Sequence, residues 1–176
     1  TNRFCDVFTT VSKYSTDILA KRYIFPIHAQ VIYNGIKTSK FETKNRIYGP
    51  KEILNIAIFS RLEPEKNIDF VINAYIASSF LKSNTKLVVH GNGNKQEKIE
   101  KKIQKYLLGN IIKLAPAINL TGETYGAYDL VLIPSNYESF SLVALEAIVS
   151  ERCVLCTGMT GIGHDFGNLV STFKNN

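Results

Sequence analysis

Two glutamates separated by seven residues are the leading candidates for chemistry in this sequence. Glu138 and Glu146 lie in "YESFSLVALEA", on either side of the start of an apolar helix, which is expected near Ser141. Serine is a preferred helix N-cap, and the free amides of a helix N-terminus attract anions. The amides of residues 139–142 would then face a phosphate, and the two carboxylates would accept hydrogen bonds from sugar hydroxyls. In the alternative interpretation, Glu138 is solvated and Glu146 points outward.

Two cations form a second candidate group in "SRLEPEKN", which follows a predicted strand. Arg61 would lie at the strand end and Lys66 at the start of the next helix, with Pro64 stiffening the turn between them. Guanidinium and ammonium groups next to helix amides suit a phosphate or a pyrophosphate. A surface pair bridged to Glu63 and Glu65 fits the same spacing.

The glycine pair in "HGNGNK" is a weaker signal. Gly91 and Gly93 follow a strand but lack the third glycine of a dinucleotide fingerprint and the spacing of a Walker loop. They fit either a turn that brings the backbone close to a ligand or a plain strand–helix turn.

We expect no metal site. The three histidines do not pair with Cys, Asp or Glu at metal-ligand spacing, and we interpret the adjacent pair His164-Asp165 as structural or solvated. Cys153 and Cys156 spell C-x-x-C, but in a buried strand residues three apart point to opposite faces, so core packing is the favoured interpretation.

These residues must be positioned by alternating strands and helices. The expected strands are "LNIAIFS", "TKLVVHG", "NIIKLA", "DLVLIPS" and "RCVLCTG", and the expected helices span about 66–81, 95–108, 121–128 and 141–150. This alternation predicts an α/β fold with a Rossmann-like, doubly wound parallel sheet. In such sheets ligands bind outside the carboxyl ends of the strands, where the strand order reverses.

The chain is expected to divide into three parts. Residues 1–36 contain a short strand–helix–strand unit, from "DVFTTVS" to "AQVIYNG", that is too small for a core of its own. Residues 37–52 are polar and without pattern, which is typical of a linker or hinge, and residues 53–176 form the α/β domain.

Composition limits the class of protein. Hydrophobic residues make up 45% and charged residues 20%, as in soluble globular proteins, and no apolar run reaches the roughly 18 residues of a membrane-spanning helix. Three cysteines and no apolar leader predict a reducing, cytoplasmic location. Much of the net charge of +6 lies in one amphipathic, lysine-rich helix, which we interpret as a solvated face rather than a nucleic-acid site.

The ordered set of motifs resembles the retaining GT-B glycosyltransferases of family 4. The matching segments are "DVFTTVS…VIYNGI", "FSRLEPEKNIDFVINAY", "LVVHGNGNKQEKIEKKI" and "YDLVLIPSNYESFSLVALEAIVSERCVLCTG", which span nearly the whole chain. Members of this family have two Rossmann-like domains. The resemblance therefore implies the end of an N-terminal domain, the hinge and the C-terminal, donor-binding domain.

The resemblance also implies roles for individual residues. Arg61 and Lys66 match the cations that hold the donor's pyrophosphate, and Glu138 matches the glutamate at the donor sugar. Ser139, Phe140, Ser141 and Leu142 match the segment at the distal phosphate, and Glu146 matches the glutamate that holds the ribose hydroxyls. Gly91 and Gly93 match the donor-side glycine turn, and the loop near Ala115 and Pro116 matches the one beside the nucleobase.

The sequence departs from the family pattern at three glycine positions and at one glutamate. The usual E-G-F-G reads Glu138-Ser139-Phe140-Ser141, and the usual glycine before the arginine is Ser60. Added serine side chains would narrow the space around the phosphate or the donor sugar. The glutamate often found after the last glycine loop is absent, with Asp165 nearby.

The resemblance implies a hexosyltransferase-type enzyme without a cofactor or metal. It would use a UDP- or GDP-sugar and a glycan or lipid-linked acceptor, with retention at the anomeric carbon, in surface glycan or polysaccharide synthesis. The longer protein would associate peripherally with the inner face of the membrane. The alternatives are a nucleotide-sugar-binding module without turnover and a cofactor-binding oxidoreductase domain, which the incomplete glycine fingerprint disfavours.

Overall fold

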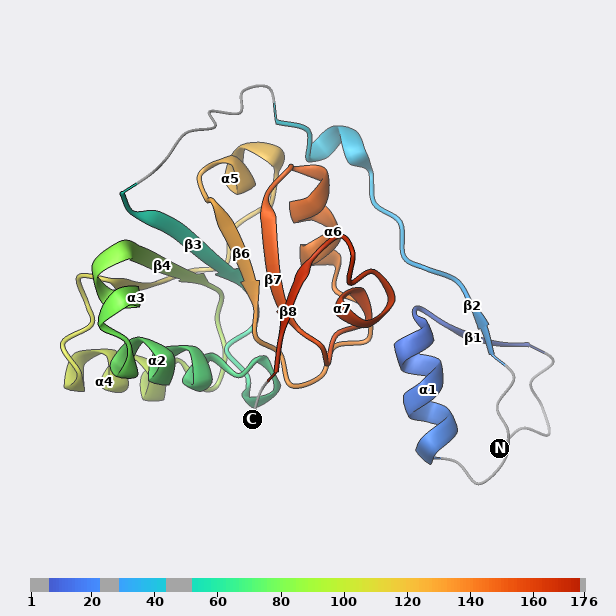
Figure 1. The fold of residues 1–176 in the computed structure, drawn as a ribbon, viewed down its shortest axis with the longest axis horizontal. Coiled ribbons are helices and arrows are strands. Elements are labelled where there is room, and N and C mark those ends of the chain that lie inside the picture. Colours follow the sequence, from blue (N-terminus) through green and yellow to red (C-terminus); the bar gives the residue numbers. More distant parts are fainter. Residues whose placement is uncertain (1–6, 23–28, 44–51, 175–176) are drawn as a thin grey trace.

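The computed structural model describes residues 7–22, 29–43 and 52–174. Its main feature is a six-stranded parallel sheet in the order β5-β4-β3-β6-β7-β8 (Figure 1). The strands are β3 (Leu54–Phe59), β4 (Thr85–His90), β5 (Ile112–Ala115), β6 (Leu130–Ile133), β7 (Cys153–Thr157) and β8 (Ser171–Phe173). The α/β fold class is confirmed, as are the five predicted strands. The sequence analysis missed β8, whose three residues are too few to show a pattern.

Helices cover both faces of the sheet (Figure 1). They are α2 (Ile68–Ala77), α3 (Ser79–Asn84), α4 (Gln96–Lys105), α5 (Gly122–Gly126), α6 (Leu142–Val149) and α7 (Gly161–Asp165). Successive side chains of a strand point to opposite faces. Accordingly, Ile56 and Ile58 of β3 pack in a core with α2 and α4, whereas Ala57 and Phe59 pack in a second core with α5 and α6.

The single helix predicted over residues 66–81 is wrong. The structure has a short 3-10 helix, η3 (Pro64–Lys66), followed by α2 and α3. Asn67 takes a left-handed conformation, φ 55°, which separates η3 from α2. Ser78 is extended and accepts a hydrogen bond from the Leu81 amide, so it ends α2 and caps α3. The helices α4 and α5 are shorter at both ends than predicted, whereas α6 agrees within one residue.

The N-terminal unit consists of β1 (Phe8–Thr10), α1 (Lys13–Arg22) and β2 (Ala29–Val31), and its two strands are parallel. This confirms the predicted strand–helix–strand unit. A 3-10 helix, η2 (Thr38–Lys40), follows within the stretch predicted as a linker. Next to it, Phe41 is buried, and its carbonyl accepts a hydrogen bond from Ser150 Oγ at 2.8 Å. This end of the linker is thus packed on the α/β domain.

The three-part division of the chain stays a prediction, since residues 44–51 lie outside the described ranges. Cys5, the first of the three cysteines, also lies outside them. Among the helices of these ranges, none has the length and apolar character needed to cross a bilayer.

Candidate functional site

The strand order places a crevice between β3 and β6. The chain moves from β3 outward to β4 and β5, then returns to the other side of β3 and continues through β6, β7 and β8. The carboxyl ends of β3 and β6 are therefore the switch point at which ligands bind in sheets of this kind. The loops that follow these two strands meet there, because the Asn136 amide donates to the Glu65 carbonyl at 2.8 Å.

A cleft of about 210 Å³ lies at this switch point. Its lining brings together four of the predicted site residues: Arg61, Lys66, Glu138 and Ser141. Lys66 Nζ lies 3.3 Å from Glu138 Oε2, and both side chains are largely shielded, with 17% and 22% of their surface exposed. The same carboxylate oxygen accepts a hydrogen bond from Ser135 Oγ at 3.1 Å. Glu138 is thus paired inside the cleft and is not a solvated surface residue.

Arg61 is placed differently from Lys66. Its side chain is 73% exposed, and Nη2 lies 3.3 Å from Glu65 Oε1. An exposed pair of this kind contributes little to stability, so the guanidinium can exchange its partner at low cost. The surface-pair interpretation therefore describes Arg61 in this structure, although Arg61 also lines the cleft.

The loop that carries Glu138 is held on both sides. The Glu138 amide donates to the Met159 carbonyl at 3.1 Å, and its carbonyl accepts from the Gly161 amide at 2.9 Å. The ring of Phe140 is buried, and it lies 6.2 Å from that of Phe166. The start of α6 is therefore fixed against α7.

Helix α6 begins at a strained serine. Ser141 is the N-cap and has φ 93° and ψ 93°, a conformation that L-residues with a side chain rarely adopt. Its hydroxyl accepts a hydrogen bond from the Ala144 amide at 3.3 Å. Ser141 replaces the glycine of the family pattern, and its side chain is buried at the cleft. Ser139 and Leu142 flank this cap, and Leu142 is exposed.

We expect Ser141→Gly to stabilise the protein. Backbone strain of this kind costs about 1–3 kcal/mol, whereas glycine loses only a few tenths as an N-cap. The expected gain in the free energy of unfolding is about 1 kcal/mol, measured by urea denaturation. Ser139→Gly is the matched control, because Ser139 has no positive φ. It should lose about 0.5–1 kcal/mol, and a Ser141→Gly variant that loses as much would contradict the strain argument.

Glu146 does not line the cleft with Glu138. It lies farther along α6, beyond Val143, which does line the cleft. Its Oε2 accepts a hydrogen bond of 2.8 Å from the hydroxyl of Tyr125 on α5. Tyr125 is fully buried. This burial is the larger cause, and the neighbouring Glu146 carboxylate the smaller one, that raises the pKa of the phenol far above its usual value. Tyr125 is thus a neutral donor, and Glu146 does not point freely outward.

A second cleft, of about 330 Å³, adjoins the first. The two share part of their lining, from Phe59 to Arg61. The rest of its lining comes from the carboxyl end of β4, the turn after it and the loop after β5: His90, Gly91, Asn92, Ala117, Ile118 and Leu120. This lining is mostly apolar and would suit a flat ring.

His90 joins two sides of the second cleft. Its ring is stacked on Phe59 with centroids 5.2 Å apart, and its Nε2 lies 2.6 Å from the Tyr128 hydroxyl. The other nitrogen, Nδ1, lies 3.3 Å from the Pro116 carbonyl in the loop after β5. Burial lowers the pKa of His90, so the ring is neutral near pH 7.

The glycine turn approaches backbone rather than open space. A Cβ on Gly91, whose φ is 152°, would lie 1.8 Å from the Ser60 carbonyl oxygen, and one on Gly93 would lie 2.5 Å from that of Leu62. These glycines pack the turn after β4 against the loop that carries Arg61. Gly91 lines the second cleft, whereas Gly93 is absent from the lining of the described clefts.

The N-terminal unit contacts the loop that carries Glu138. The hydroxyls of Ser12 and Ser15 lie 2.5 Å and 3.2 Å from the Ser139 carbonyl oxygen. The carboxylate of Asp165 in α7 accepts hydrogen bonds from the backbone amides of Lys13 and Tyr14 at the start of α1, at 2.6 Å and 3.2 Å. These links connect residues on either side of the predicted hinge.

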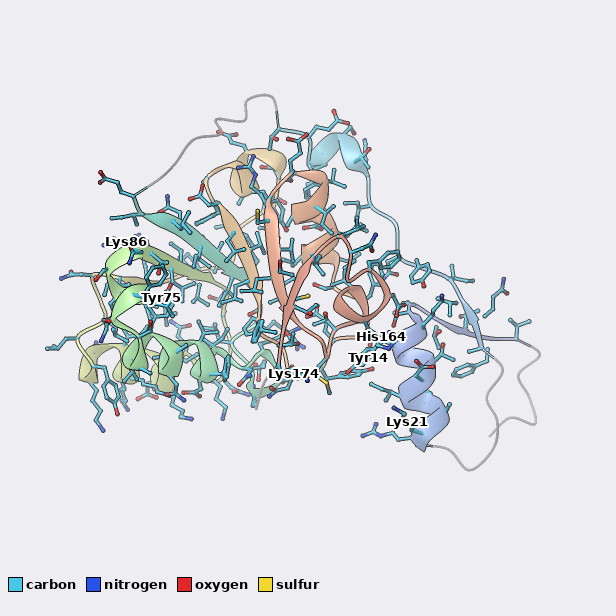
Figure 2. All side chains as sticks on the ribbon, viewed as in Figure 1. Tyr14, Lys21, Tyr75, Lys86, His164 and Lys174 are labelled. Carbon is cyan, nitrogen blue, oxygen red and sulfur yellow. The ribbon has the colours of Figure 1, made fainter. Side chains whose placement is uncertain are left out.

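The pair His164-Asp165 makes hydrogen bonds within the protein. His164 Nδ1 lies 2.7 Å from Asp165 Oδ1. Figure 2 shows Tyr14 and His164 side by side between α1 and α7, with ring centroids 5.4 Å apart. On β7, Cys153 is exposed and Cys156 buried, and burial raises the pKa of the Cys156 thiol. The described residues contain no group of side chains that could hold a metal ion.

Sequence reasoning missed Tyr125, Ser12 and Ser15. Their contacts join segments 21 to 127 residues apart, and no local pattern signals such contacts.

The fold of this chain matches about half of each of two solved structures. The chain is similar to the UDP complex of Anabaena Alr3699/HepE, with a TM-score of 0.81 and 19% identity over 99% of this chain and 51% of that one. It is also similar to WaaG, a glycosyltransferase involved in lipopolysaccharide biosynthesis, with a TM-score of 0.76 and 21% identity over 95% of this chain and 49% of that one.

The sequence places the chain within a family. The profile of the glycosyl transferases group 1 family matches residues 39–173, and the chain belongs to this family. It is 29% identical over 154 residues to the GtfA subunit of a UDP-N-acetylglucosamine–peptide N-acetylglucosaminyltransferase of Limosilactobacillus reuteri, covering 86% of this chain and 28% of that protein. It is 28% identical over 172 residues to the glycosyltransferase MJ1607 of Methanocaldococcus jannaschii, covering 90% and 43%. The chain spans less than half the length of these relatives.

Proposed function

We propose that the chain is the donor-binding half of a retaining, family 4 hexosyltransferase. The intact enzyme would transfer a sugar from a UDP- or GDP-sugar to a glycan or lipid-linked acceptor in surface glycan synthesis, with UDP or GDP as the leaving group. It would act in the cytoplasm, at the inner face of the membrane. The observation that carries the proposal is the convergence of Lys66 and Glu138 on the start of α6, at the switch point of the sheet.

The shape of the site supports a ligand with three parts. The diphosphate would lie at Lys66 and the amides of residues 140–142, where the cation and the helix start both favour negative charge. The nucleobase would enter the second, mostly apolar cleft, and Arg61, which lines both clefts, would bridge the two. The structural neighbours Alr3699/HepE and pneumococcal GtfA were crystallised with UDP, which supports a nucleoside diphosphate as the ligand.

In the proposed reaction, the bond between the anomeric carbon and the diphosphate breaks as the acceptor oxygen attacks from the same face. Lys66 and the helix start stabilise the charge that develops on the leaving diphosphate. The leaving phosphate oxygen takes the acceptor's proton, and Glu138 orients the sugar. Its pairing with Lys66 keeps the carboxylate beside the bond that breaks. Metal independence is part of the proposal.

Calorimetric titration of the 176-residue chain with UDP, GDP, UDP-glucose and GDP-mannose tests the proposal. We expect saturable binding of one of these nucleotides and of its sugar. No binding of any of the four, or tighter binding of NADH than of UDP and GDP, would refute a donor site.

A binding module without turnover is the second candidate, because the chain covers less than half of its relatives. Mixing the chain with the bound nucleotide-sugar and with glycan acceptors distinguishes the two candidates. Formation of a glycosylated product shows that this chain is active by itself, and binding without release of nucleoside diphosphate shows that this chain alone acts as a binding module.

A further inference from the structure

Glu146 is held by one donor. Tyr125 Oη lies 2.8 Å from Glu146 Oε2, and within the described residues no other group donates to this carboxylate. An ionised carboxylate accepts about four hydrogen bonds. The tyrosine uses one of these sites and fixes the plane of the carboxylate, while Oε1 has no donor from the described part of the chain. A ligand with two adjacent hydroxyls would suit the remaining acceptor sites.

Tyr125 is itself fixed in position. Its ring packs against Phe59 of β3, with centroids 5.3 Å apart, and against Phe41 beside η2, at 6.1 Å. Its helix is equally constrained, because Thr121 caps α5 and Gly122 lies so close to Glu42 that a Cβ would come within 2.4 Å of the carbonyl. A buried phenol between two rings has little freedom, so its hydroxyl is a fixed reference point for Glu146.

We propose that Tyr125 is a positioning residue that orients the Glu146 carboxylate toward the ribose hydroxyls of the donor nucleotide. The inference rests on the proposed function, in which Glu146 contacts the ribose. Tyr125 does not touch the ligand and acts through Glu146. By fixing the Glu146 carboxylate, Tyr125 gives the protein an oriented acceptor for two adjacent hydroxyls. Removal of one ribose hydroxyl from the ligand should therefore abolish the contribution of Tyr125 to binding.

The experiment compares ligands that differ by one hydroxyl. Dissociation constants of UDP and 2′-deoxy-UDP, and of GDP and 2′-deoxy-GDP, are measured for the wild-type chain and for Tyr125→Phe, which keeps the ring and removes the hydroxyl. The wild type should prefer the ribonucleotide. In Tyr125→Phe this preference should fall by about 3- to 10-fold, the value of one hydrogen bond, while 2′-deoxynucleotide affinity stays the same.

Tyr75→Phe is the matched control. Tyr75 on α2 is also fully enclosed, and its hydroxyl lies 2.7 Å from Thr85 Oγ1. It lines neither of the two clefts. Its replacement removes a buried hydroxyl in the same way and should change neither dissociation constant. Glu146→Gln, as the positive control, should reduce the ribose preference at least as much as Tyr125→Phe.

The outcomes separate this inference from the proposed function. If the wild type binds with a ribose preference and Tyr125→Phe retains it, the positioning role is wrong and the donor site stands. If Tyr125→Phe weakens the binding of the ribonucleotide and of the 2′-deoxynucleotide equally, the effect is that of a general loss of structure, and the inference is also overturned. If Glu146→Gln retains the preference for the ribonucleotide, Glu146 does not bind the ribose hydroxyls, and the inference is wrong. If the wild type binds no nucleotide, the proposed function itself is refuted.

Discussion

Replacing Lys66 with alanine is expected to weaken the binding of UDP or GDP by about 1.5–3 kcal/mol, the range for a hydrogen bond to a charged group. The ammonium is largely shielded from water and lies at the cleft, so solvent screens its attraction to a phosphate less than at an exposed site. Its loss also leaves Glu138 without a cation beside the anionic ligand. The change is measured as the ratio of dissociation constants by calorimetry, after circular dichroism has established that the variant is folded.

Lys102→Ala is the matched control for Lys66→Ala. Lys102 on α4 is 21% exposed and pairs with Asp69 at 2.9 Å, so it resembles Lys66 in burial and in partner but lies outside both clefts. Its variant should bind nucleotide like the wild type. An unchanged dissociation constant for Lys66→Ala would remove Lys66 from the diphosphate site.

Gly91→Ala is expected to lower the free energy of unfolding by at least about 3 kcal/mol, among the largest effects of a single substitution. Two causes act together. The new Cβ would collide with the Ser60 carbonyl, and the φ of 152° is strained for alanine. The collision cannot be relieved by a side-chain rotation, because the opposing atom belongs to the backbone. Urea denaturation measures the loss.

Gly109→Ala provides the comparison for Gly91→Ala. A Cβ on Gly109 meets no atom within 4 Å, and its φ is not positive. The variant should be as stable as the wild type, or more stable by up to about 1 kcal/mol, because alanine restricts the unfolded chain. If Gly91→Ala and Gly109→Ala had the same stability, the turn after β4 would be free to move away from β3.

The features that follow from periodicity could be predicted. Five strands, the parallel sheet and the start of α6 at Ser141 were all predictable from the sequence, because hydrophobic alternation and capping chemistry are local. The same logic placed Lys66 and Glu138 in the segments that follow two of the predicted strands, and the structure brings them within 3.3 Å. Their roles in binding a donor stay predictions.

Features that depend on tertiary contacts could not be predicted. The positive φ of Ser141 is imposed by the packing of its loop, since a lone serine prefers other conformations. The break at Ser78 results from a side-chain cap that outweighs the helical pattern around it. The pairing of Tyr125 with Glu146 joins two helices across a core, and nothing in the spacing of either helix indicates it.

The hydroxyls of Ser12 and Ser15 have a practical consequence for dissecting the protein. A shorter protein that starts at residue 53 would keep every strand of the six-stranded sheet, but the Ser139 carbonyl would lose both of its donors and Asp165 would lose the amides it accepts. The backbone next to Glu138 would then face solvent. A cut chosen by sheet boundaries alone would therefore alter the very loop it was meant to isolate.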